Sequence, residues 1–312
     1  MSFSSGFALW DLWFQASDRA DDGVLDAFFP AYDKAFILPN EKEGMEGFQS
    51  CLALNHGAMH ETLSARHGRF KELVLVARET RDGPVVGGAN FLVLLPQSTS
   101  LHAATWTINL NYLFVDPVLR GRSLSRKVLS ACLRLAGQLA NTEPQTGATP
   151  EGLVFLELND PFRLTPEQYR IDSEHAGIDQ LARLAYWSHM GAKVLGFTYV
   201  QPALSVQQGD DDTLAMAVIG STNGQLGAGL VRSHLERFFA ISVLKGSPLD
   251  KNQSVRRQLS ELGQWSERGK PVRLLDLADP ESRLQVLLNR ADDRPASLVE
   301  ALRGMCHDDR GS

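Results

Sequence analysis

The sequence predicts an α/β fold, in which a mixed central sheet is flanked by helices and followed by a helical C-terminal extension. Short apolar runs, typical of buried strands, alternate with longer segments of helical spacing. A strand-like run at residues 110–115 passes through a tight turn directly into a helical pattern. The region after residue 220 is polar and helical in pattern, which predicts one domain over residues 1–220 and an extension over residues 221–312.

The N-terminal part is expected to contain one strand, two helices and a hairpin. Aromatic residues at 7–15 suit a half-buried strand, and helical spacing follows at about 24–36 and 45–65. Two apolar runs, 72–78 and 85–95, are separated by the turn sequence RDGP. This is a strand, turn and strand signature, so we expect an antiparallel pair here.

The helix that follows the tight turn is expected to pack on the sheet, because its apolar residues recur on one stripe. The stripe consists of Leu124, Val128, Leu129, Cys132, Leu135, Ala136 and Leu139. Residues 152–158 then predict a buried strand, 178–190 a helix, and 193–200 and 213–219 the last two strands. Between them, the order Thr165, Pro166, Glu167, Gln168 is a capping box with proline at the first helical position, which predicts a short helix.

Composition and charge exclude several classes of protein. The chain has 312 residues and a formal net charge of -6, which argues against general binding to nucleic acid or to an anionic membrane. Its three cysteines are too few and too scattered for a disulfide framework or a thiolate metal site. No apolar run approaches the roughly 20 residues that cross a bilayer. We therefore expect a cytoplasmic protein.

The tight turn carries the most specific signal. A strand that ends in a turn of small residues and opens into a helix directs free backbone N–H groups beyond the strand, where they can hold a phosphate. The turn holds Arg120, Gly121, Arg122, Ser123, Leu124 and Ser125, preceded by Val115, Asp116 and Pro117. It resembles the acyl-CoA loop of the GNAT acetyltransferase superfamily, Arg/Gln-x-x-Gly-x-Gly/Ala after a strand that ends in Val-x-Pro. Ser123 and Ser125 stand where that family has glycine or alanine.

The resemblance implies a cofactor and a set of residues that bind it. Acetyl-CoA, or another acyl-CoA, would be the co-substrate, and no metal would be needed. The pyrophosphate would lie on the turn, and the end of the preceding strand would contact pantetheine and the thioester carbonyl. The implied cofactor-binding residues are Leu113, Phe114, Val115, Arg120, Gly121, Arg122, Ser123, Leu124, Ser125 and Lys127.

The resemblance also implies a base and an acid. Glu157 interrupts an apolar strand, and burial would raise its pKa toward neutrality, so it is the candidate catalytic base. The alternative is a strand-end carboxylate that is held by a structural partner. Trp187 occupies the slot of the family's acidic tyrosine, and Tyr186 is turned about 100° around the helix. Another tyrosine, such as Tyr169 or Tyr199, could supply the proton.

The acceptor site has a single candidate residue. In the family the first helices and their connection form one wall of that site, so Glu41 could bind a cationic amine; alternatively, it begins a helix as a solvated residue. His56 and His60 lie one helical turn apart, but no carboxylate stands at a matching position, so no metal site is expected.

The sequence thus predicts an enzyme, an acyl-CoA-dependent N-acetyltransferase in which a small amine or peptide amine attacks the thioester directly. The alternative is a degenerate GNAT-like module that binds acyl-CoA as a sensor or scaffold without efficient turnover. Ser123, Ser125 and Trp187 favour that alternative. The expected partners are the amine and, as one option, a second copy of the chain, with packing, dimerisation or partner binding as the roles of residues 221–312.

Overall fold

The computed structural model describes residues 3–38, 42–96, 106–141, 152–205, 207–277, 280–290 and 292–308. The chain forms two compact units. The first unit consists of residues 1–154 and 234–251, and the second of residues 155–233 and 252–312. The predicted boundary near residue 220 stays a prediction, because compactness alone does not reveal which part folds independently.

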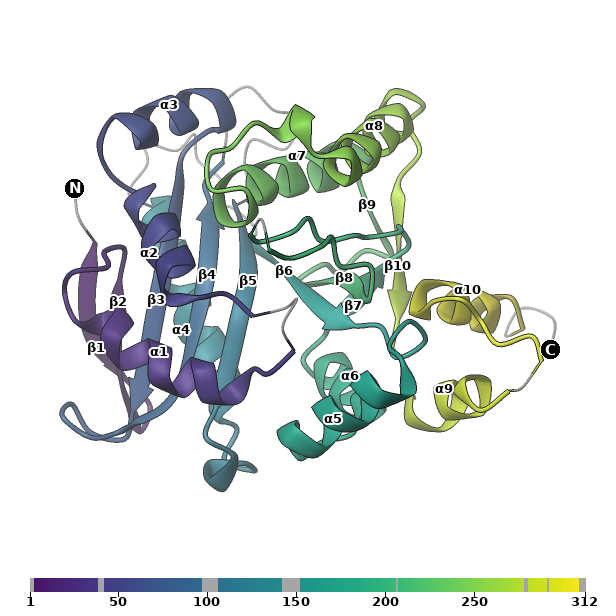
Figure 1. Cartoon of the computed structure of the whole chain (residues 1–312), viewed down its shortest axis with the longest axis horizontal. Coiled ribbons are helices and arrows are strands. Elements are labelled where there is room, and N and C mark those ends of the chain that lie inside the picture. The colour runs from purple at the N-terminus through teal and green to yellow at the C-terminus, as the bar shows by residue number, and fades with distance from the viewer. Residues whose placement is uncertain are drawn as a thin grey trace. The chain divides into compact units, whose positions relative to one another are not determined.

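The sheet of the first unit is antiparallel throughout, in the order β1-β2-β3-β4-β5 (Figure 1). Its strands are β1 (Ser4–Leu9), β2 (Leu12–Ser17), β3 (Phe70–Arg78), β4 (Val85–Leu94) and β5 (Trp106–Val115). The predicted pair β3 and β4 is confirmed. The expectation of one strand over residues 7–15 was wrong, because a tight turn at Trp10, with φ of 54°, divides the stretch into two strands.

Helices cover both faces of this sheet (Figure 1). Helices α1 (Val24–Ala35), α2 (Met45–Ala53) and α3 (Gly57–His67) precede β3, and α4 (Leu124–Asn141) packs against β4 and β5. Aromatic residues of α1 and α2 pack with Phe114 of β5 in one buried cluster. The prediction of one helix over residues 45–65 was wrong, because the chain turns at residues 54–56 and Gly57 takes a left-handed φ of 70°.

Part of the C-terminal region belongs to the first unit. The segment begins at His234 within α7 (Ala228–Phe238), which continues into the π-helical turn η2 (Phe239–Val243), and the 3-10 turn η3 (Leu249–Lys251) follows. The buried guanidinium of Arg237 donates to the carbonyl oxygens of Leu95 and Arg69, at 3.1 and 2.6 Å. Burial lowers the pKa of Arg237 to about 10. This segment therefore holds the adjacent ends of β3 and β4.

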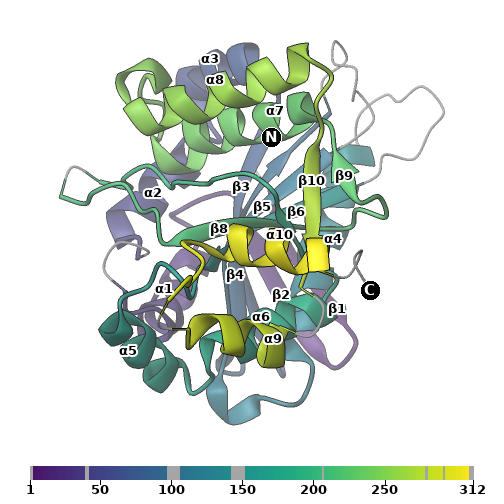
Figure 2. The ribbon, with the colours of Figure 1, turned by 90° about the vertical axis from the view of Figure 1, so that its right-hand side faces the viewer.

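The second unit contains the strand order β6-β8-β7-β10-β9, and helices such as α9 and α10 lie beside these strands (Figure 2). Its strands are β6 (Gly152–Asn159), β7 (Lys193–Leu195), β8 (Leu214–Ile219), β9 (Gln225–Leu226) and β10 (Val272–Asp276). Its helices are α5 (Pro166–Ala176), α6 (Gln180–His189), α8 (Gln253–Glu267), α9 (Pro280–Leu288) and α10 (Leu298–Asp308). Helix α10 lies beside β10, and α9 lies beside α6.

Several predictions in this unit can be compared with the structure. The capping box of α5 is confirmed, since Thr165 and Gln168 each accept a backbone N–H from the other. The predicted strand over residues 193–200 is shorter and ends at Leu195. Strand β10 was not predicted; it pairs antiparallel with β7.

The fold class is confirmed: a mixed α/β architecture with helices beside the sheets and further helices toward the C-terminus. From β3 to β8, the order of three strands, a helix, a strand, helices and two strands agrees with the elements predicted for this part of the sequence. Within the described ranges, none of the helices combines the length and apolar character needed to cross a membrane.

Candidate functional site

The tight turn between β5 and α4 is built by Asp116. Its carboxylate accepts the N–H of Val118 at 2.9 Å, and its carbonyl oxygen accepts the N–H of Leu119 at 3.0 Å. These bonds start the 3-10 turn η1 (Pro117–Leu119), in which proline supplies the fixed φ of a first position. The turn therefore ends β5 abruptly and leads the chain into the Arg120–Ser125 loop.

The Arg120–Ser125 loop contains two residues in left-handed conformations. Gly121 has φ of 82° and Ser123 has φ of 55°. The N–H of Lys127 donates to Ser123 O at 3.1 Å, so α4 begins directly after Ser123. The N–H groups that precede this bond have no carbonyl one turn back within the helix. Ser123 thus holds a left-handed conformation that glycine adopts without strain, at a cost of about 1–2 kcal/mol for a residue with a Cβ.

Two of the predicted phosphate-binding cations form ion pairs. Arg122 Nη1 lies 2.6 Å from Glu79 Oε1, and Lys127 donates to Asp11 in the turn between β1 and β2. The hydrogen bond from Lys127 lowers the pKa of Asp11. Exposed pairs of this kind contribute about 0–1 kcal/mol, so a doubly charged phosphate can replace either carboxylate. The exposed Arg120 lies in the same loop.

The end of β5 is paired with β4. Leu113, Phe114 and Val115 stand opposite Ala89, Gly88 and Gly87. The Phe114 ring is buried over Gly88, where a Cβ would lie 2.8 Å from the ring and 2.7 Å from Leu75 O. Glycine at residue 88 therefore lets the aromatic cluster reach the sheet. Since the Phe114 side chain belongs to the core, any ligand contact here would fall to the main chain.

A β-bulge lies just before this segment. Asn90 pairs with Tyr112 and Phe91 with Leu110, which leaves Asn111 as the extra residue of β5. Bulges redirect side chains and are frequent beside active sites. The Asn111 amide donates to Glu72 Oε1 and to Asn90 Oδ1, both at 2.9 Å.

Sequence reasoning missed Glu72, which lies on β3 and is 0% exposed. Its carboxylate accepts hydrogen bonds from Asn90 at 2.7 Å, from Asn111, and from Ser242 Oγ at 2.7 Å. Burial raises its pKa to about 7, against the lowering effect of these donors. Two features of the sequence point to Glu72: it interrupts an apolar strand, and the next two strands carry asparagines.

Glu157, the predicted base, lies on β6 in the second unit and is half-buried. The hydroxyl of the buried Tyr199 donates to Glu157 Oε1. Burial raises the pKa of Glu157 to about 7, the Tyr199 hydrogen bond lowers it, and the nearby Asp211 raises it. Burial and the Glu157 charge also raise the pKa of Tyr199. The structure therefore joins the predicted base to one of the tyrosines considered as an acid.

The other candidate acids have different surroundings. The Tyr169 hydroxyl donates to Asp179 Oδ2 at 2.7 Å, and Asp179 caps α6, so this tyrosine supports a helix start. Tyr186 and Trp187 lie on α6 with their ring centroids 5.5 Å apart and their planes at 72°. Both side chains are half-buried.

Glu41, the predicted acceptor contact, lies outside the described residues. Glu43, two positions later, is described: its N–H donates to the Tyr32 hydroxyl at 2.7 Å, and its carboxylate pairs with Lys245 at 2.6 Å. Lys245 has φ of 50°. The chain that follows the predicted acceptor loop is thus anchored to the segment after η2.

The histidines of the α2–α3 region contact backbone groups. His56 Nε2 lies 3.1 Å from Asp18 O, and His60 Nδ1 lies 3.1 Å from Leu54 O. In the part of the chain that the structure describes, no three His, Cys, Asp or Glu side chains gather in a way that could hold a metal ion.

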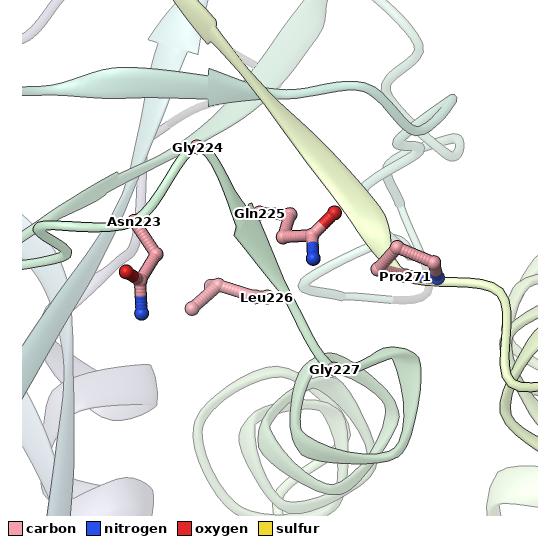
Figure 3. A pocket seen from close by; sticks show the side chains of 6 residues that line it. All are labelled: Asn223, Gly224, Gln225, Leu226, Gly227 and Pro271. Atoms are coloured by element: carbon pink, nitrogen blue, oxygen red, sulfur yellow. The ribbon is translucent and has the colours of Figure 1, made fainter.

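A pocket of about 590 Å³ lies in the second unit, at a glycine-rich stretch (Figure 3). It is lined by Asn223, Gly224, Gln225, Leu226, Gly227 and Pro271. In this stretch, Gln225 and Leu226 form β9, which pairs with β10, and Gly227 O accepts the N–H groups of Leu230 and Val231 in the first turn of α7.

Comparisons with known proteins gave one kind of match. A scan against models of protein families found none, and a search of curated proteins found none either. Among solved structures, the chain is similar to a Desulfovibrio desulfuricans protein assigned to the GNAT family of acetyltransferases (16% identity, 67% of this chain and 98% of that one, TM-score 0.34). It is also similar to the ribosomal-protein-S18-alanine N-acetyltransferase of Escherichia coli (14%, 72% and 97%, TM-score 0.33). A third is Arabidopsis thaliana Naa50 in complex with a bisubstrate analogue (9%, 66% and 97%, TM-score 0.34).

At these identities, the residues of this chain have to decide its chemistry. The first two of these three solved structures are named as acetyltransferases, and the third is a complex with a bisubstrate analogue.

Proposed function

We propose that this chain is an acyl-CoA-dependent N-acyltransferase, with acetyl-CoA as co-substrate and a small amine or peptide amine as acceptor. The supporting observation is the Arg120–Ser125 loop. A strand ends there, Gly121 and Ser123 take left-handed φ values, and α4 begins directly after them. Such a helix start favours phosphate groups, and CoA pyrophosphate is the proposed ligand.

The proposed reaction is a direct displacement. The acceptor nitrogen attacks the thioester carbonyl, the C–S bond breaks, and CoA leaves as the thiol with the proton that the nitrogen gives up. We assign polarisation of the carbonyl to main-chain N–H groups of Leu113–Val115 and removal of the ammonium proton to Glu157. A pKa of about 7 suits this base. Near neutral pH a substantial fraction of the Glu157 side chains is ionised, and the ionised carboxylate still binds a proton readily.

Calorimetry with acetyl-CoA tests the binding step. Wild-type protein should bind, and Ser123→Asp should weaken binding by roughly tenfold or more, because a carboxylate in the exposed loop repels the pyrophosphate. The matched control is Ser130→Asp, which makes the same change two turns further along α4. Equal affinities of the two variants would contradict this placement of the pyrophosphate.

Thiol release with a panel of amines tests the chemical step. Glu157→Gln should lower turnover by roughly 10²-fold or more while acetyl-CoA binding persists. Unchanged turnover across the pH range would assign Glu157 to structure. Binding of acetyl-CoA without thiol release for any amine would favour the alternative function, an acyl-CoA sensor or scaffold.

A further inference from the structure

The first unit buries a network of polar side chains that converges on the Glu72 carboxylate. Its buried members are Glu72 on β3, Asn90 on β4, Thr107 and Asn109 on β5, His234 on α7 and Ser242 on η2, and the half-buried Asn111 on β5 links them to the carboxylate. Both Glu72 carboxylate oxygens accept hydrogen bonds, Oε1 from Asn90 and Asn111 and Oε2 from Ser242. Burying so many polar groups is costly unless all of them are satisfied, so the network has to be specified closely.

The hydrogen bonds that lead from Thr107 to Glu72 all point in one direction, toward the carboxylate. Thr107 Oγ1 lies 2.9 Å from His234 Nδ1, and His234 Nε2 lies 3.0 Å from Asn109 Oδ1. An amide oxygen only accepts, so Nε2 carries the hydrogen and Nδ1 accepts from the threonine hydroxyl. Burial lowers the pKa of His234, which agrees with this neutral form.

The chain of hydrogen bonds ends at the carboxylate. Asn109 Nδ2 donates to Asn111 Oδ1 at 2.8 Å, and Asn111 Nδ2 donates to Glu72 Oε1. An ionised carboxylate only accepts, so it sets the orientation of the Asn111 amide and, through it, of every amide before it. The Glu72 carboxylate on β3 therefore orients three side chains at alternate positions of β5, namely Thr107, Asn109 and Asn111.

The position of Glu72 is itself fixed. The β2–β3 ladder ends where Ser17 pairs with Val74. Beyond that point, the Asn55 side chain takes the place of a strand: its Oδ1 accepts the Glu72 N–H at 2.9 Å, and its Nδ2 donates to Glu72 O at 2.8 Å. The main chain that carries the carboxylate is thus bonded to the turn between α2 and α3.

We propose that Glu72 is a positioning residue of the acyl-CoA site. Through Asn111, its carboxylate fixes the bulge of β5 and with it the main chain of Leu113–Val115. This inference rests on the proposed function, since that main chain is assigned to the pantetheine and the thioester. A bulge that slips by one residue would turn the following side chains to the opposite face and move the N–H groups that the ligand needs.

Loss of the Glu72 carboxylate should weaken the binding of one part of the ligand, the pantetheine. Without the carboxylate, the amides of Asn90 and Asn111 lose an acceptor, which costs about 1–3 kcal/mol in a buried site. The turn before the Arg120–Ser125 loop keeps its bonds to Asp116, and the Arg120 N–H still donates to Pro117 O of η1. Contacts to pantetheine should therefore weaken while contacts to the phosphates persist.

Calorimetry with two ligands tests this inference. Acetyl-CoA occupies both parts of the proposed site, whereas adenosine 3′,5′-bisphosphate carries phosphates but no pantetheine. Glu72→Ala should weaken acetyl-CoA binding by about tenfold, which corresponds to about 1.4 kcal/mol, and leave bisphosphate binding within about twofold. Glu72→Gln should restore acetyl-CoA binding, because its amide oxygen still accepts from Asn90 and Asn111 and its nitrogen can donate to Ser242.

A second variant keeps the test decisive if Glu72→Ala does not fold. Asn111→Ala removes the contact at the bulge, leaves the carboxylate bonded to Asn90 and Ser242, and should show the same selective loss. Equal losses for both ligands, no loss for either, or a Gln variant as weak as the Ala variant would overturn the positioning role. If wild-type protein binds neither ligand, the proposed function fails and this inference fails with it.

Discussion

Replacing Glu72 with glutamine should make the first unit more stable above neutral pH and leave it unchanged in acid. The folded pKa is about 7 and the ordinary value is 4.5. Between these values the unfolded chain releases a proton that the folded chain retains, so the stability of the wild type falls as the pH rises through this window. Glutamine resembles the protonated carboxyl group and does not incur that loss.

The magnitude follows from the size of the shift. A difference of 2.5 between 7 and 4.5, at 1.36 kcal/mol per unit, is about 3 kcal/mol. Because the carboxylate is fully buried, solvent screening does not reduce this figure. The free energy of unfolding of Glu72→Gln should therefore equal that of the wild type near pH 4.5 and exceed it by about 3 kcal/mol near pH 8.

Urea unfolding at pH 5, 6, 7 and 8 measures the difference, with fluorescence as the probe. Because the chain has two compact units, Trp187 and Trp265 of the second unit are replaced by Phe in every protein compared. The signal then comes from Trp10, Trp13 and Trp106 of the first unit. The matched control is Glu61→Gln, the same change at an exposed position of α3.

Two results would refute this reasoning. One is a stability difference between Glu72→Gln and the wild type that stays constant from pH 5 to pH 8. The other is a loss of stability at pH 8, which would mean that the ionised carboxylate is worth more to its three donors than its burial costs. The pKa values of the half-buried Glu157 and the buried Asp160 are also raised, but both residues remain in every protein compared and their effects cancel.

Other changes have clear expected outcomes. Ser123→Gly should raise the unfolding free energy by up to about 1 kcal/mol, because glycine adopts the φ of 55° without strain; a loss seen by thermal unfolding would argue against that strain. Tyr199→Phe removes a hydrogen bond that lowers the Glu157 pKa, so the acid limb of the pH–rate profile should move to higher pH, and an unmoved limb would separate this pair from catalysis. Asp160 accepts the N–H groups of Leu298 and Phe162, so Asp160→Asn should speed hydrogen exchange at the start of α10 and cost about 1–3 kcal/mol; unchanged exchange would contradict this. Arg237→Met should cost on the order of 3 kcal/mol, since the carbonyl groups of Leu95 and Arg69 lose their donor, and a cost under 1 kcal/mol in urea unfolding would show that water replaces it.

Local patterns in the sequence predicted several elements well. The hairpin of β3 and β4, the strand, turn and helix of residues 110–139, and the capping box of α5 were all predicted, because each depends on residues that are neighbours in the chain. The Glu157 pKa could also be expected to rise, because a carboxylate within an apolar strand is buried whatever covers it.

The tertiary structure decided what depends on distant partners. Glu72 receives its third hydrogen bond from Ser242, 170 positions away, and Tyr199 reaches Glu157 across 42 positions. Asp11 and Glu79 come from separate turns to pair with the loop cations. No periodicity of the sequence encodes such contacts, because periodicity reports which face of an element is buried and not what lies against it. The sequence alone therefore determined the elements and the candidate phosphate loop, whereas packing decided which carboxylates are buried, what holds them, and hence at which pH they can act.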